Sequence, residues 1–213
     1  MHIFDLKSQS LCLWCVKPKY HDSGIFDLFV HHPYLCHQCQ KLIKQPIKFK
    51  LENLQCKAIV EYSLDIERLI YRFKEDKDTP MAPAFYYSMK KTLKKHNDWV
   101  FVVMPSSKSK TTQRGFLPLE LMLKPYTSNI SYALKKTSDI KQAKQSKNKR
   151  KNIHHDIVCE NIDQFKDKRV VLIDDVATTG STLLSAYHLL NPYAKEIKAI
   201  VFAVHPLLVF SIR

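Results

Sequence analysis

The chain has 213 residues, of which 45% are hydrophobic and 25% are charged, a balance that excludes a largely disordered protein. Its 34 Lys and Arg residues against 20 Asp and Glu residues give a formal net charge of +14. We therefore expect either a polyanionic partner, of which nucleic acid is the commonest in a cell, or simply a solvated basic surface. No run approaches the ~18 apolar residues of a membrane-spanning helix, and the N-terminal residues lack the pattern of a secretory signal, so a cytoplasmic protein without a transmembrane segment is expected.

Residues 1–50 carry two Cys-x2-Cys pairs. The pairs consist of Cys12, Cys15, Cys36 and Cys39. Such pairs bring four thiolates onto one tetrahedral zinc ion, which stabilises a segment that has little core of its own. A redox pair and an iron–sulfur site are the alternatives, and disulfides are disfavoured in the cytoplasm. We expect a structural zinc-binding module over residues 1–50 and a second domain over residues 51–213.

Strand-like and helix-like segments alternate from residue 57 onward. Strands are expected at 57–63, 99–105, 130–134, 170–176 and 196–205, and helices at 64–75, 84–96, 116–124 and 178–190. This alternation predicts an α/β fold with a mostly parallel sheet. We expect residues 46–56 to form a connector or an edge hairpin and residues 106–115 to form a polar loop. The last strand is expected at a sheet edge or a subunit contact.

The stretch RVVLIDDVATTGSTLLSA, residues 169–186, points to a ligand site. A parallel strand would deliver Asp174 and Asp175 to the carboxyl end of the sheet, where ligands bind in open α/β folds. The turn that follows places backbone N–H groups at the start of a helix, where they attract phosphate, and Gly180 permits close approach. Hydroxyls that would add hydrogen bonds belong to Thr178, Thr179, Ser181 and Thr182. The alternative is an ordinary capped helix after a buried strand.

Basic residues gather in two further segments, the loop at 106–115 and the stretch 135–151. Those expected to contact DNA are Lys108, Lys110, Arg114, Lys144, Lys147, Lys149, Arg150 and Lys151. In a transferase these cations would close over the site and neutralise a leaving pyrophosphate, whereas in a nucleic-acid binder they would follow the phosphate backbone. A solvated loop is the third possibility. Trp14 is the best candidate for an exposed ring on which bases stack.

The sequence VVLIDDVATTGST resembles the phosphoribosyl-pyrophosphate (PRPP) signature of type I phosphoribosyltransferases. The resemblance implies that Asp174 and Asp175 meet the ribose hydroxyls and that Ala177 through Thr182 wrap the 5-phosphate, with magnesium bound alongside PRPP. The whole chain is similar to the ComF family of competence proteins, which join a four-cysteine zinc module to a phosphoribosyltransferase-like domain. Further segments that resemble this family are YRFK at 71–74, RGF at 114–116 and the Gln-to-Asn stretch at 142–152.

Two functions follow from this resemblance. The first is a DNA-handling protein of natural transformation that binds single-stranded DNA in the cytoplasm, binds PRPP or a related phosphate, and works with other transformation proteins such as a helicase. The second is an active magnesium-dependent phosphoribosyltransferase that joins a nitrogenous base to PRPP, with Asp174 and Asp175 as catalytic residues. The zinc module and the basic charge favour the first function, because salvage chemistry on small molecules needs neither.

Overall fold

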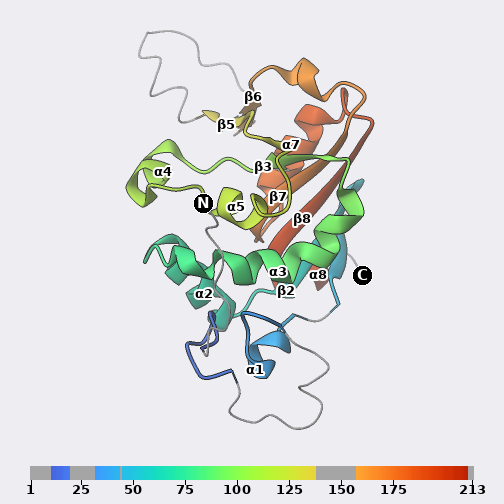
Figure 1. The fold of residues 1–213 in the computed structure, drawn as a ribbon. Helices are drawn as coiled ribbons and strands as arrows, with labels where there is room; N and C mark the ends of the chain where they lie inside the picture. The colour runs from blue at the N-terminus through green and yellow to red at the C-terminus, as the bar shows by residue number, and fades with distance from the viewer. Residues whose placement is uncertain (1–10, 20–31, 44, 138–156, 211–213) are drawn as a thin grey trace.

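The computed structural model describes residues 11–19, 32–43, 45–137 and 157–210, and its strands form one main sheet and one small sheet (Figure 1). The main sheet has six strands in the order β1-β2-β8-β7-β3-β4, and β5 pairs with β6 apart from it. The strands are β1 Ile47–Leu51, β2 Leu54–Glu61, β3 Val100–Val103, β4 Ile130–Ser131, β5 Leu134–Lys136, β6 Ile157–Cys159, β7 Arg169–Ala177 and β8 Glu196–Val204.

The main sheet is parallel except at one edge. β2, β8, β7, β3 and β4 pair in parallel, and β1 pairs antiparallel with β2. This confirms the expected mostly parallel sheet. Of the two alternatives for residues 46–56, the structure shows the edge hairpin and not the connector. The expected domain boundary after residue 50 falls inside β1. The expectation for the last strand was wrong: β8 lies inside the sheet between β2 and β7, and its apolar residues are buried because helices cover both faces.

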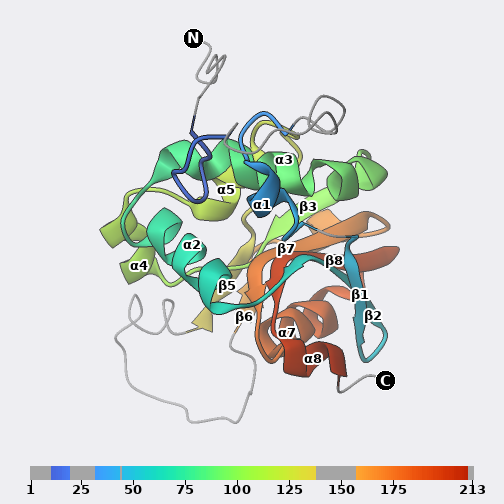
Figure 2. The same cartoon turned by 90° about the horizontal axis from the view of Figure 1, so that it is seen from below.

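Helices cover both faces of the main sheet, as Figure 2 shows. α2, α3 and α5 contribute side chains to the core on one face, and α7 contributes Leu183, Ala186 and Leu190 to the core on the other. The helices are α1 His37–Gln40, α2 Leu64–Lys74, α3 Ala82–Leu93, α4 Lys108–Arg114, α5 Pro118–Leu123, α7 Ser181–Leu190 and α8 Pro206–Phe210, with 3-10 turns η2 Thr79–Met81, η3 Lys94–His96 and η4 Ile162–Phe165. None of the helices in the described ranges is long and apolar enough to cross a membrane.

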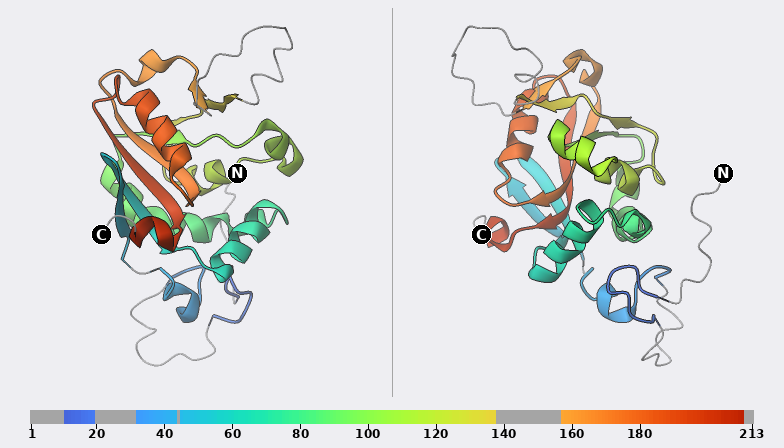
Figure 3. Two further views of the ribbon diagram at one scale, coloured as in Figure 1. Left: turned by 180° about the vertical axis from the view of Figure 1, so that it is seen from behind. Right: turned by 90° about the vertical axis from the view of Figure 1, so that its left-hand side faces the viewer.

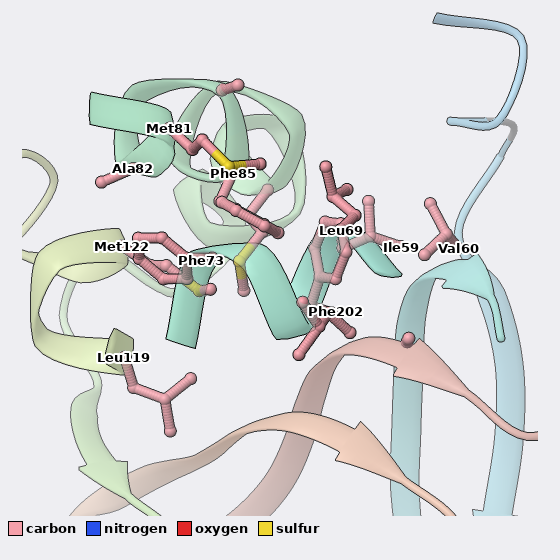
Figure 4. Close-up of a cluster of buried hydrophobic side chains, with 14 of the residues drawn as sticks. Ile59, Val60, Leu69, Phe73, Met81, Ala82, Phe85, Leu119, Met122 and Phe202 are labelled. Carbon is pink, nitrogen blue, oxygen red and sulfur yellow. The ribbon is translucent and has the colours of Figure 1, made fainter. Parts of the chain in front are cut away.

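The core above the sheet is built around aromatic rings (Figure 4). α2 begins where the Ser63 side chain accepts a hydrogen bond from the backbone of Ile66, and its apolar positions then recur at helical spacing toward the sheet. The ring of Phe73 lies 4.8 Å from that of Phe85, which in turn lies 4.8 Å from Phe202 of β8. These contacts lock α2 and α3 onto the strands.

The segment expected to be a polar loop contains a short helix. α4 spans seven residues of that loop and ends where Gly115 adopts a left-handed conformation, with φ of 80°. Only Arg114 among the residues of α4 is buried. A helix so polar has no apolar stripe for periodicity to detect, so the sequence pattern did not predict it.

The cysteine-bearing segment is docked against α2 and α3 (Figure 3). The Arg72 guanidinium donates to the carbonyl oxygen of Trp14 at 2.7 Å and to that of Leu13. The Trp14 ring packs edge-on to Phe202, with centroids 5.9 Å apart, and only 4% of the residue is exposed. The expectation of an exposed Trp14 for base stacking was therefore wrong, because docking of the segment buries the ring.

The Arg72 contacts predict that this side chain stabilises the docked arrangement. Replacing Arg72→Met removes charge-assisted hydrogen bonds to two carbonyls and an ion pair with Asp78 at 3.0 Å. We expect the free energy of unfolding to fall by about 2 kcal/mol, measured by urea denaturation followed through tryptophan fluorescence. The matched control is Arg68→Met on the same helix, whose side chain is 80% exposed and should cost less than about 0.5 kcal/mol. Equal destabilisation of the two variants would contradict the role given to Arg72.

Candidate functional site

The residues expected to form a ligand site lie at the carboxyl end of β7. The strand does not stop at the two aspartates but continues to Ala177, pairing with β8 along the way. Asp174 and Asp175 are therefore held by the sheet itself and not by a flexible loop. The backbone N–H of Asp175 donates to Asp174 Oδ1 at 2.8 Å, which orients the Asp174 carboxylate.

The turn after β7 has the form of a phosphate cradle. Ala177 is buried and its carbonyl accepts from the backbone of His205 at 2.9 Å, which anchors the start of the turn. Thr178, Thr179 and Ser181 are exposed. The hydroxyls of Thr179 and Ser181 lie 3.0 Å apart, at the point where α7 begins. The Ser181 N–H donates to Thr179 Oγ1 at 3.3 Å, and the N-terminal dipole of this ten-residue helix favours an anion in this position.

Gly180 is required at this turn for two reasons. Its φ of 74° is in the left-handed region, which side chains other than glycine rarely adopt. A Cβ at this position would also lie 2.6 Å from Cδ1 of Leu51, at the end of β1. The turn is thus packed directly against the β1–β2 hairpin, and a larger residue would push the two apart.

Lys74 joins the candidate site from α2, a contact that the sequence pattern did not reveal. Its Nζ forms an ion pair with the carboxylate of Asp175, and the two side chains are only 16% and 17% exposed. Desolvation of the Asp174 carboxyl, together with the neighbouring charge of Asp175, raises the pKa of Asp174 to about 8. Burial therefore disfavours the charged form of Asp174, while Lys74 pairs with the neighbouring Asp175.

The carboxylate pair can accept hydrogen bonds from two adjacent hydroxyls of a ligand, such as the vicinal hydroxyls of a sugar. Carboxylate oxygens are also the ligands that magnesium prefers. Asp174 and Asp175 are the residues that would hold a magnesium ion at this site, and the ion would supply positive charge to a phosphate ligand.

Arg114, one of the residues expected to contact DNA, lies in a different setting. The residue is 7% exposed, and its guanidinium pairs with Glu75, which follows Lys74 in the chain. The hydrogen bond from Arg114 lowers the pKa of Glu75. Lys108 and Lys110 are exposed at the start of the same helix. The remaining expected contacts, Lys144, Lys147, Lys149, Arg150 and Lys151, lie outside the described residues, as does the Gln-to-Asn stretch.

The four cysteines converge as the sequence predicts. The sulfur atoms of Cys12, Cys15, Cys36 and Cys39 all lie within 4.8 Å of one another, and those of Cys15 and Cys36 are 3.6 Å apart. A tetrahedral zinc site with Zn–S bonds of about 2.3 Å requires sulfurs about 3.8 Å apart, so the cluster can hold such an ion. Among the described residues this is the only group of three or more Cys, His, Asp or Glu side chains gathered in this way.

The other two cysteines do not belong to the cluster. Cys56 is buried in the sheet, and burial raises the pKa of its thiol to about 12. Cys159 is half-buried at the end of β6. Both are free thiols that form no disulfide.

Comparison with protein-family models agrees with this geometry. The phosphoribosyl transferase domain family matches residues 124–207. These residues include β7 and the turn from Ala177 to Thr182, which we call the phosphate turn. Hypoxanthine phosphoribosyltransferase from Staphylococcus aureus is a structural neighbour, with 14% identity and a TM-score of 0.41 over 61% of this chain and 66% of that one.

Two curated relatives share the name competence protein ComFC. The protein from Streptococcus pneumoniae is 26% identical over 167 residues, which cover 76% of this chain and 72% of that one. The protein from Bacillus subtilis is 26% identical over 157 residues, 70% of this chain and 62% of that one. These relatives, the matching domain and the cysteine cluster ahead of it agree with one another, and together they support a protein of the ComF type.

Proposed function

We propose that the protein handles single-stranded DNA in the cytoplasm during natural transformation and binds PRPP at the turn from Ala177 to Thr182. The two relatives named as competence proteins, together with the phosphoribosyltransferase domain, support a competence-related function. The observation that carries PRPP binding is the phosphate cradle beside two sheet-held carboxylates. The net charge of +14 supports a polyanionic partner.

In the proposed complex the backbone N–H groups and hydroxyls of Thr178 to Thr182 bind the 5-phosphate. Asp174 and Asp175 accept hydrogen bonds from the ribose hydroxyls, and the same carboxylates would hold magnesium, which would offset the charge of the pyrophosphate. Lys74 holds Asp175 in place before the ligand arrives. Because Lys74 and the ligand share one carboxylate, binding should change the environment of the last turn of α2.

The second candidate function is transfer of the ribosyl group to a nitrogenous base. The carboxylate pair supports it as well, because orientation of the ribose and stabilisation of charge are the main contributions a protein makes to that reaction. Pyrophosphate release from PRPP that depends on an added purine or pyrimidine base would establish this function. PRPP binding without release, across a panel of such bases, would leave PRPP as a ligand of the DNA-handling protein.

PRPP binding is tested by Asp174→Asn with Asp175→Asn. Removal of the charged acceptors for the ribose hydroxyls should weaken PRPP affinity at least tenfold, or about 1.4 kcal/mol, in calorimetric titration with magnesium. Asp163→Asn, at an exposed carboxylate in η4, is the control and should bind like the parent. Thr179→Ala serves as a second variant, since it alters the cradle without breaking the Lys74 pair. Parent-like affinity in both the double variant and Thr179→Ala would refute the site.

We further propose that the cysteine cluster holds one structural zinc ion. Purified protein should then contain zinc, and Cys36→Ser should lower the zinc content measured by mass spectrometry and unfold the docked segment. Cys159→Ser, at a thiol away from the cluster, should keep its zinc. Unchanged metal content in Cys36→Ser would contradict the assignment. Iron with visible absorbance would point to an iron–sulfur site instead, and a disulfide between paired cysteines to a redox function.

Binding of single-stranded DNA should weaken steeply with salt, because lysines displace counterions from phosphates. We propose that Lys108, Lys110 and the basic residues of 135–151 contribute to this contact. Replacing Lys144, Lys147 and Lys149 by glutamine should reduce the slope of log affinity against log salt by about 2, since each neutralised phosphate adds about 0.7 to the slope. Fluorescence anisotropy with a labelled oligonucleotide measures the slope. An unchanged slope would remove this segment from the DNA contact.

A further inference from the structure

A cationic groove lies against the face of the sheet opposite to Leu51 and the phosphate turn. Its cavity of about 320 Å³ is lined by residues of β1, β2 and β8 and by His96 of η3. Side chains alternate along a strand, so Lys48 and Lys50 point away from the face to which Phe49 and Leu51 contribute. Figure 2 shows the β1–β2 hairpin at the edge of the sheet.

Positive charge in this groove is concentrated and poorly compensated. Lys48 of β1 stands directly opposite Lys57 of β2, an arrangement that destabilises a sheet. Burial lowers the pKa of Lys57, and so does repulsion from Lys95, Lys198 and Lys48. In the part of the chain that the structure describes, Lys48, Lys50, Lys57 and Lys95 form no ion pair with a carboxylate, whereas Lys198 pairs with Glu196 at 2.7 Å.

Packed aromatic rings support the inner side of the groove. His96 is 3% exposed, and its ring meets that of Trp99 edge-on at 5.0 Å. Lys198 Nζ lies 4.7 Å from the centre of the Trp99 ring, so this lysine is held by packing as well as by its ion pair. Lys48, Lys50 and Lys57 therefore remain as the cations that an anionic ligand would meet.

From this geometry we propose that the groove binds single-stranded DNA, with phosphates on Lys48, Lys50 and Lys57 and one base in the cavity. A cavity of this volume is of the size of small-ligand pockets and accepts an unstacked base, whereas a duplex keeps its bases stacked inside. The proposal rests on the DNA-handling function proposed above and adds a contact surface that is separate from residues 106–115 and 135–151. Because β1 turns Leu51 toward Gly180 and its lysines toward the groove, the hairpin touches both ligand sites.

The test replaces Lys48, Lys50 and Lys57 together by glutamine. Without these three cations on the phosphates, the salt slope for a labelled single-stranded oligonucleotide should fall by about 2. On raising salt fourfold, from about 50 to about 200 mM, the affinity of the parent should fall about 16-fold more than that of the variant. The variant should fold at least as stably as the parent in thermal melts, because the replaced lysines repel one another.

The control replaces Lys77, Lys124 and Lys166 by glutamine, three exposed lysines outside the groove, and should keep the parent slope. A parent slope in the groove variant would overturn the groove while leaving DNA binding intact. Absence of salt-dependent binding by the parent protein would overturn the DNA-handling function itself. The proposal would also be overturned if thymidine monophosphate or poly-glutamate displaced the oligonucleotide with equal affinity per unit. Displacement by thymidine monophosphate would indicate that the groove binds a free nucleotide. Displacement by poly-glutamate would indicate that it binds an acidic protein.

Discussion

The last turn of α2 joins parts of the molecule that are far apart in the sequence. Successive residues of a helix point in directions about 100° apart, so neighbouring side chains reach different partners. Arg72 binds backbone carbonyls of the cysteine-bearing segment, and Phe73 packs into the aromatic core. Lys74 then pairs with Asp175, and Glu75 pairs with Arg114. A single amphipathic helix thereby orients the cysteine cluster, the carboxylate pair and α4 relative to one another.

The β1–β2 hairpin has a comparable role at the other edge of the sheet. Leu51 fills the space that Gly180 leaves, so the phosphate turn is shaped partly by a residue from the start of the fold. Lys48 and Lys50 of the same strand line the cationic groove. Lysines on an edge strand also protect it against pairing with a second chain. The charge of Lys48 and Lys50 therefore has a structural benefit in addition to the proposed binding of a ligand.

Much of the fold was predictable because it is local. Hydrophobic periodicity located α2, α3, β2, β3 and β8, and the abrupt change from apolar to acidic residues located the ligand end of β7. The place of β8 was not predictable, since strand order depends on pairings between distant segments. The candidate site shows the same difference between local motifs, which the sequence reveals, and long-range contacts, which it does not. Asp174, Asp175 and Gly180 are recognisable from one short motif, whereas the Lys74 pair and the burial of Trp14 and Arg114 arise from long-range packing.

The account depends on two ligands that occupy different surfaces of one domain. Calorimetric titration of PRPP with magnesium into the protein alone, and into protein saturated with a labelled single-stranded oligonucleotide, tests this directly. The account predicts the same PRPP stoichiometry in both titrations, with the oligonucleotide still bound by anisotropy, because the phosphate turn and the DNA surface share no residue. Displacement of the oligonucleotide in step with PRPP binding would show that the two compete for one site and would contradict the account.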